Sequence, residues 1–346
     1  MYSTKPMTES YSNCTSVMLR NHYIVAVQIE PILQILIGLY YALLIIVESM
    51  LFAVLLGIHI KIRKYCHPFF GSLFGYILFC YILCDLAEGI CQFLFIFNAG
   101  NSALEAVYMI YDLTYAAVTP LAFCCVIERS IATLWAVSYE TNRNWALFTI
   151  SVAFSVSAYI YFGSFQCRGC FASAAVTAII IIGCVALYFL NRKRTLRYQT
   201  DEELMGKTSL SMRYQIIENL IMVRKALLPV IVLDSMVTLV DFLSNEVTDR
   251  MLRDNHDQCH SLMVFAPYIV LNHFALLFEY SIPLYILMTR KAYRKHLPAP
   301  LRFLSSSRRI HQKSHDSIIQ NVFGKELNVV PTQNEYFAKL QNEWKK

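Results

Sequence analysis

The hydrophobic positions of this chain are gathered into long blocks that polar segments separate. Within blocks such as residues 42–58 and 176–190, apolar side chains follow one another without the alternation that strands of a membrane barrel show. A helix of about 20 apolar residues is long enough to cross the hydrocarbon of a bilayer. The pattern therefore predicts seven membrane-spanning helices, at residues 35–60, 69–96, 103–127, 145–163, 171–190, 226–245 and 262–288.

The composition agrees with a membrane protein and excludes a soluble domain. Hydrophobic residues make up 56% of the 346 positions and charged residues 16%, whereas a soluble domain has about 25% charged residues. We therefore expect an all-α membrane protein in which residues 35–288 form a bundle of seven transmembrane helices.

Basic residues are distributed unequally between the predicted loops. Of the 30 Lys and Arg residues, 25 follow the first, third, fifth and seventh spans, and five lie on the opposite side. Because cytoplasmic loops carry an excess of Lys and Arg, we expect residues 1–34 on the outer side of the membrane and the tail 289–346 in the cytoplasm. Asn13, in the sequon Asn13-Cys14-Thr15, is then expected to carry a glycan.

The net charge of +6 arises mostly from this excess on the inner face. It favours contact with anionic membrane lipid or a cytoplasmic protein and gives no indication of nucleic-acid binding. The segment 290–297, which is basic and partly aromatic, directly follows the last predicted span. We expect this segment to face the lipid surface.

The orientation places four of the 11 cysteines outside the cell, namely Cys14, Cys167, Cys170 and Cys259. A disulfide is expected among them, and the three pairings that four cysteines allow stay open. Cys167 and Cys170 have a spacing found in zinc sites, but a second pair of Cys or His ligands is not nearby in the sequence. We therefore expect no metal site and no cofactor.

Acidic residues occur inside the predicted spans, whereas Lys and Arg do not. Ionisable groups in a membrane are costly and usually mark a functional site. Three interpretations stay open: the acids are protonated, they bond to Tyr, Ser and Thr hydroxyls, or they hold a metal ion or an amine ligand. Asp112, on the outer half of the third span, is where a ligand from outside would arrive. The candidates for a buried polar or ligand site are Glu48, Asp85, Glu88, Asp112, Asp234 and Asp241, with Glu279 as a further acid.

The third predicted span ends in Glu128-Arg129-Ser130. An acid beside an Arg is either a solvated surface pair of little energetic value or a switch in which the Arg is held in one state and released in another. Residues 207–225 show helical spacing of apolar residues and run into the sixth span. They are either an extension on the membrane surface or a lever that moves with that span.

Two motifs resemble a known receptor family. The first is Glu128-Arg129-Ser130-Ile131-Ala132-Thr133, ending in Tyr139-Glu140. The second, before the sixth span, is Leu210-Ser211-x-x-Tyr214-Gln215-x-x-Glu218-Asn219. At these positions the chain resembles the Sra superfamily of nematode seven-helix chemoreceptors, most closely the serpentine receptor class epsilon (Sre) group.

The resemblance implies a G-protein-coupled chemosensory receptor for a small molecule or odorant, active in olfaction at the plasma membrane or a sensory cilium. Its partners would be an unknown small-molecule ligand, membrane lipid and a heterotrimeric G protein. It implies that a switch and G-protein-coupling site contains Glu128, Arg129, Tyr139, Glu140, Tyr214, Glu218 and Asn219.

The alternative function is a seven-span ligand-gated channel or transporter. A transporter is expected to show internal repeats and helices interrupted by Gly or Pro, and the sequence shows neither. The sequence also has no Gly-rich phosphate loop, no paired-His metal motif and no nucleophile elbow. We therefore expect no enzyme.

Overall fold

The computed structural model describes residues 15–18, 24–27, 31–63, 67–98, 100–135, 144–164, 169–200, 216–217, 219–254, 266–298 and 301. The chain divides into two compact units, residues 1–297 and residues 298–346. All helices and strands named below belong to the first unit.

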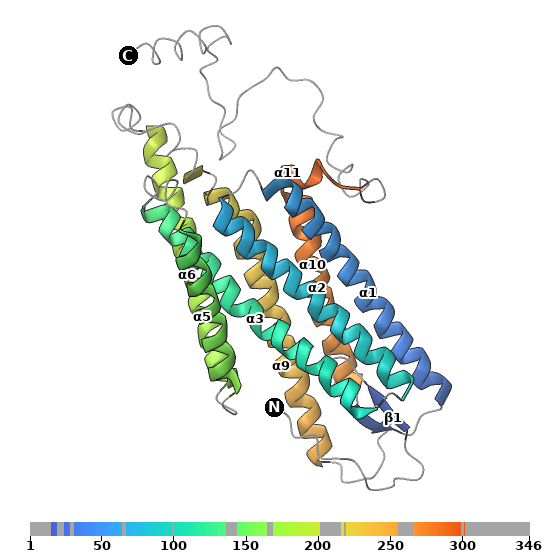
Figure 1. Cartoon of the computed structure of the whole chain (residues 1–346). Helices are drawn as coiled ribbons and strands as arrows, with labels where there is room; N and C mark the ends of the chain where they lie inside the picture. The colour runs from blue at the N-terminus through green and yellow to red at the C-terminus, as the bar shows by residue number, and fades with distance from the viewer. Residues whose placement is uncertain are drawn as a thin grey trace, which may run out of the picture. The chain divides into compact units, whose positions relative to one another are not determined.

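Long helices dominate the described residues (Figure 1). They are α1 (Pro31–Ile62), α2 (Pro68–Ile96), α3 (Asn101–Leu134), α5 (Trp145–Ser164), α6 (Gly169–Thr200), α9 (Leu228–Asp254) and α10 (Ala266–Thr289), followed by the short α11 (Lys291–Arg294). Within the described residues, six helices are long and apolar enough to cross a membrane, whereas the corresponding apolar stretch of α5, Phe148–Tyr159, is shorter. The all-α membrane class is confirmed, while the seventh span and the orientation stay predictions.

Three helices continue well past the C-terminal end of the apolar block that predicts them. The third block ends at residue 127, but α3 continues to Leu134; α6 continues to Thr200 and α9 to Asp254. Polar residues in these extra turns, such as Thr133 and Asn191, are buried against other helices. Hydropathy marks the part of a helix that lies in lipid and misses turns that protein contacts stabilise.

A π-helical turn, η3 (Val223–Leu227), precedes α9. Its backbone is wider than an α-helix, and the Leu228 N–H bonds to the Val223 carbonyl five residues earlier. Pro229 follows in the first turn of α9 and has no N–H to donate. This turn joins α9 to residues 219–222, which are helical; most of the predicted lever, residues 207–215 and Glu218, lies outside the described residues.

A short hairpin that the sequence did not predict precedes α1. Strand β1 (Thr15–Met18) pairs with β2 (Ile24–Val27) in antiparallel register, with Thr15 opposite Val27 and Met18 opposite Ile24. The pair contacts α1. Four residues per strand are too few for an alternating pattern to stand out in a sequence.

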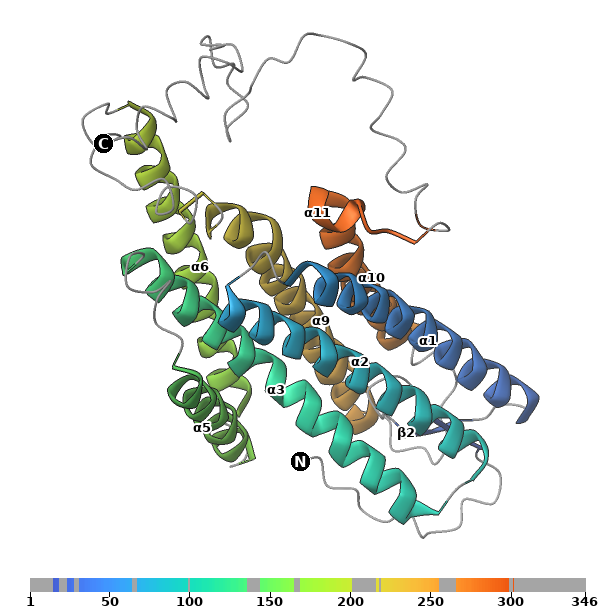
Figure 2. The same ribbon diagram turned by 45° about the horizontal axis from the view of Figure 1, so that its top comes forward.

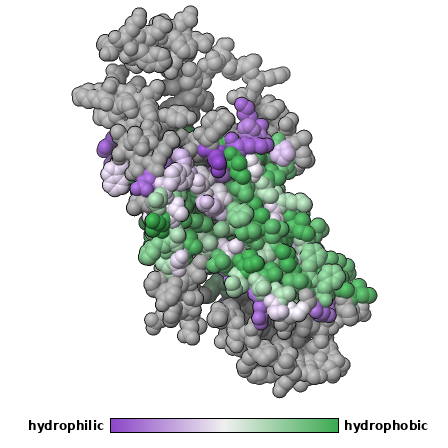
Figure 3. Space-filling view, in the orientation of Figure 1, coloured by the Kyte–Doolittle hydropathy of each residue, from purple (hydrophilic) through white to green (hydrophobic). Residues whose placement is uncertain are grey.

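Within this unit α2 packs between α1 and α3, α9 packs on α10, and α5 and α6 pack against α3 on the side away from α1 (Figures 1 and 2). We call the end at which α1, α3 and α10 terminate the inner end, because the basic residues predict that it faces the cytoplasm. Hydrophobic side chains form a band across the visible face of the helices below this end (Figure 3). Many large apolar residues in that band are exposed, as expected for a surface in contact with lipid.

Candidate functional site

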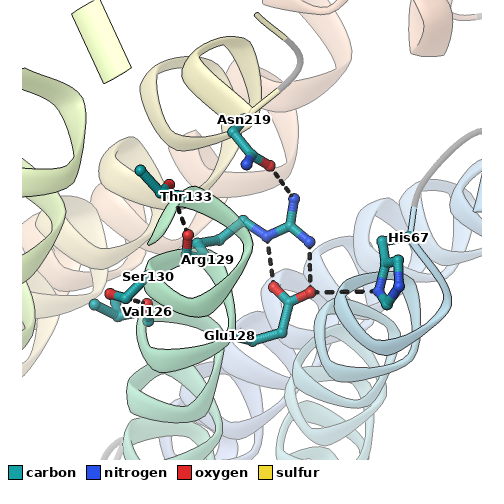
Figure 4. Close-up of polar contacts among 7 residues, drawn as sticks. All are labelled: His67, Val126, Glu128, Arg129, Ser130, Thr133 and Asn219. Carbon is teal, nitrogen blue, oxygen red and sulfur yellow. Dashed lines mark hydrogen bonds and ion pairs between the residues drawn. The ribbon is translucent and has the colours of Figure 1, made fainter. Parts of the chain in front are cut away.

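Glu128 and Arg129 form a buried ion pair at the inner end of α3. The Arg129 Nε and Nη2 atoms donate to Glu128 Oε2 and Oε1, each at 2.5 Å (Figure 4). Only 5% of Glu128 and 4% of Arg129 is exposed. Two parallel N–H···O bonds are the strongest arrangement that a guanidinium and a carboxylate form. The interpretation as a solvated surface pair is therefore wrong.

Adjacent residues on a helix point in directions about 100° apart, so such a pair does not form by helix geometry alone. Contacts from other elements hold Arg129 in place. Its Nη1 atom donates to Asn219 Oδ1 at 2.5 Å, and its Cζ atom lies 4.5 Å from the centroid of the Phe70 ring in α2. The guanidinium thus connects α3 with α2 and with Asn219, in the helical turn 219–222 before η3.

His67, directly before α2, approaches the same carboxylate (Figure 4). Its Nδ1 atom lies 3.6 Å from Glu128 Oε1, and 13% of its side chain is exposed. At this separation the contact is electrostatic, and it attracts only when the imidazole carries a proton. Glu128 therefore has one permanent cationic partner, Arg129, and one partner whose charge depends on protonation.

Helix α6 is fixed to the last turn of α3 beside this pair. Asn191 Nδ2 donates to Thr133 Oγ1 at 3.1 Å and to the Leu187 carbonyl at 2.9 Å. Arg194 donates to the Thr133 carbonyl, where a cation stabilises the carbonyl end of a helix. Thr133 Oγ1 in turn donates to the Arg129 carbonyl at 2.8 Å. The backbone that carries Arg129 is therefore braced by α6.

Several predicted site residues cannot be placed. Tyr139, Glu140, Tyr214 and Glu218 lie outside the described residues, as do Asn13, Cys14, Cys167 and Cys259. Cys170 lies in α6, but its side chain is not among those described. The glycan and the extracellular disulfide stay predictions.

The acids predicted inside the membrane have different environments. Glu48 and Glu88 are buried, with 2% and 4% exposed, and Asp85, Asp234, Asp241 and Glu279 are partly buried. Asp112 is exposed on α3, on the same side as its exposed neighbours Met109 and Leu113. Asp112 is therefore not a buried acid, because an apolar helix has no polar face from which its rotation could be read; its role in a ligand site stays a prediction.

Asp234 takes part in a direct link between α2 and α9. Tyr81 in α2 donates its hydroxyl to Asp234 Oδ1 at 2.5 Å, and the Tyr81 ring stacks on Phe52 of α1 with centroids 4.7 Å apart. One turn further along α9, the Thr238 hydroxyl lies 3.4 Å from that of Tyr115 in α3. Hydroxyl bonding, one of the three interpretations, thus holds for Asp234. Among the described residues no group of three His, Cys, Asp or Glu side chains could hold a metal ion.

Four residues of the site were not singled out from the sequence: His67, Phe70, Asn191 and Arg194. Each contacts α3 from another helix or loop, as described above. Asn191 and Arg194 follow a long apolar block directly, where polar residues are ordinarily solvated, so no local pattern indicates that they contact α3. His67 stands beside Pro68, a helix-start signal, but nothing local relates it to Glu128.

A model of the Sre G protein-coupled chemoreceptor family matches residues 93–345. The match includes α3 and every later helix, and with them Glu128, Arg129 and Asn219. It confirms the resemblance that the two sequence motifs indicated. No curated protein matches the chain.

Proposed function

This chain belongs to the Sre family of G protein-coupled chemoreceptors, and from this premise we propose that Arg129 is the switch through which it signals to a heterotrimeric G protein. The observation that carries the proposal is the burial of Arg129 between α3, α2 and the turn before η3. The family match favours a receptor over the seven-span channel or transporter.

The described arrangement is the resting state in this proposal. Glu128 and Asn219 hold the guanidinium, so it is not available to a cytoplasmic partner. Breaking a buried pair by removing one partner costs about 3–5 kcal/mol, so Arg129 leaves only when another acceptor replaces the lost ones. A G protein that inserts a backbone carbonyl or an acidic side chain at the inner end supplies that acceptor.

The membrane-embedded part of α9 relates this switch to a ligand. One continuous helical stretch, Asn219–Thr248, carries Asn219 at its inner end and Asp234 near its middle. A small molecule or odorant that binds among the outer halves of the helices and shifts α9 would strain both the Tyr81–Asp234 bond and the Arg129–Asn219 bond. Such a ligand shifts the equilibrium only by the difference between its affinities for the two states.

The test uses basal nucleotide exchange, which needs no ligand. Membranes that contain the full chain and a heterotrimeric G protein are assayed for GTP-analogue uptake at equal surface expression. We expect Arg129→Ala to abolish the receptor-dependent exchange, and Glu128→Ala to raise it because the guanidinium loses its bidentate partner. Lys61→Ala, which removes an exposed charge from the inner end of α1, is the matched control. Unchanged exchange in Arg129→Ala would contradict the proposal.

A further inference from the structure

The segment after α10 is fixed to the bundle by a buried hydrogen-bond chain. Tyr293 in α11 is fully buried, and its hydroxyl lies 2.8 Å from His59 Nδ1 in α1. The other ring nitrogen, His59 Nε2, lies 2.8 Å from the Gly71 carbonyl in α2. A carbonyl only accepts, so Nε2 carries the proton and Nδ1 accepts from Tyr293. These two hydrogen bonds hold α11 against α1 and α2.

Fixing α11 in this way also buries parts of two arginines. Arg290 Nη1 and Arg294 Nε have almost no contact with solvent, and neither atom has a hydrogen-bond partner in the described part of the chain. The Arg290 guanidinium lies over the Tyr293 ring, with Cζ 5.3 Å from the ring centroid. Buried donors on a charged group are costly when no acceptor meets them. An acceptor from outside the described chain is therefore expected here.

The charge around these arginines is positive. Arg63, at the end of α1, and Arg290 both act electrostatically on His59, so both guanidinium groups lie near this side chain. Lys61 and Lys295 add exposed positive charge to the same two segments. Among the described residues, Arg290 and Arg294 form no ion pair with an acidic side chain. The acceptor that fits is an anion.

The position of these arginines indicates where the anion comes from. Arg290 directly follows Thr289, the last residue of α10 and of its membrane span. Hydrophilic side chains gather beside α1 and α11, directly above the hydrophobic band (Figure 3). This is the level at which lipid headgroups lie, and the cytoplasmic leaflet is rich in anionic lipid.

We propose that Arg290 and Arg294 form a binding site for the phosphate of an anionic phospholipid headgroup. The planar guanidinium matches the oxygens of a phosphate in two parallel hydrogen bonds, which an ammonium group does not achieve. The exposed lysines attract the lipid through general charge, whereas the two arginines bind its phosphate. The site is independent of the Arg129 switch and holds whether or not that switch operates.

The experiment measures lipid retention on the purified full chain by native mass spectrometry. Phosphatidylinositol bisphosphate is titrated against phosphatidylcholine. We expect one retained anionic lipid, and about 150-fold weaker retention in the double variant Arg290→Gln/Arg294→Gln, from about 1.5 kcal/mol for each charge-assisted hydrogen bond to the phosphate that is lost. Lys61→Gln/Lys295→Gln removes the same charge from exposed positions and is expected to weaken retention less than fivefold. Arg290→Lys/Arg294→Lys keeps the charge and is expected to fall between the two.

The outcomes distinguish a specific phosphate site at the two arginines from a general attraction of anionic lipid by surface charge. Equal losses in the arginine and lysine variants would overturn the proposal, as would full retention in Arg290→Gln/Arg294→Gln. Soluble inositol trisphosphate is added in a separate arm. If it binds the wild-type chain as tightly as the lipid does, the site takes free phosphate and the membrane is not its source. The Arg-to-Lys variant keeps the test valid if the Gln variant does not fold.

Discussion

At the scale of single residues, the polar contact that joins α3 to the helical residues before η3 is the bond from Arg129 Nη1 to Asn219 Oδ1, at 2.5 Å. The adjacent Glu128 and Arg129 stood out because they end an apolar block. Asn219, which decides how Arg129 is held, lies 90 residues further along the chain. Such a contact depends on how whole helices pack, and no local pattern records it. The same limit applies to Asp112, whose exposure follows from the rotation of α3.

The bond between Tyr81 and Asp234 gives a prediction at this scale. Tyr81→Phe removes the hydroxyl and leaves the Asp234 carboxyl without its donor in a partly buried position. We expect a loss of about 1–3 kcal/mol in stability, measured as a lower thermal unfolding midpoint in detergent. Tyr76→Phe is the control, because Tyr76 lies on the same helix with 57% of its surface exposed. Equal midpoints for the two variants would show that the bond contributes nothing.

At the scale of elements, the positions of the long helices could be predicted and their ends could not. Apolar blocks located α1, α2, α5 and α10 to within a few residues. In the extra turns of α3 and α6, Asn191 and Arg194 each bond to Thr133, and a hydropathy pattern does not record such contacts between helices. The π-helical turn lies directly before Leu228 and Pro229, which marks a distortion because it has no N–H to donate, but the sequence pattern does not show that the distortion takes a π-helical form.

The attachment of α11 gives a prediction at the element scale. His59→Phe keeps an aromatic ring in α1 but removes both ring nitrogens that connect Tyr293 to the Gly71 carbonyl. We expect the amides of residues 293–297 to exchange with solvent about tenfold faster, because a buried hydrogen bond is worth about 1.5 kcal/mol. Hydrogen exchange with mass spectrometry measures this.

The control for this experiment is His273→Phe, which keeps an aromatic ring but removes the two ring nitrogens that bond to Tyr40 and the Ile269 carbonyl, far from the inner end. Exchange in α11 is expected to stay at the wild-type rate in that variant. Faster exchange in α11 in both variants would mean that the whole bundle has loosened, and would contradict a local role for His59.

At the scale of the whole molecule, the class of the protein follows from two independent observations. The apolar blocks predict a helical membrane bundle, and the family model matches residues 93–345. The family description names no ligand. Which faces of the helices meet was not predictable either, because helices that are apolar all round carry no pattern that marks the packed face. The orientation depends on the unequal distribution of Lys and Arg.

The orientation is tested directly in animal cells. A tag after Lys346 is expected to be reached by antibody only after the cells are permeabilised, because 25 of the 30 basic residues lie on that side. A glycosidase is expected to shift the mobility of the wild-type chain but not that of Asn13→Gln. Labelling of the tag on intact cells would contradict both the orientation and an inward-facing Arg129.

The central claim is that the bonds from Arg129 to Glu128 and Asn219 set the signalling state. Two substitutions of Asn219 test it, because they are expected to change basal nucleotide exchange in opposite directions. Asn219→Ala removes an acceptor, so basal nucleotide exchange on the G protein is expected to rise by up to about tenfold, from a bond to a charged group worth about 1.5 kcal/mol. Asn219→Asp adds a negative charge that binds the guanidinium more tightly, so exchange is expected to fall below the wild-type level. Exchange that moves in the same direction in both variants, at equal surface expression, would contradict the claim.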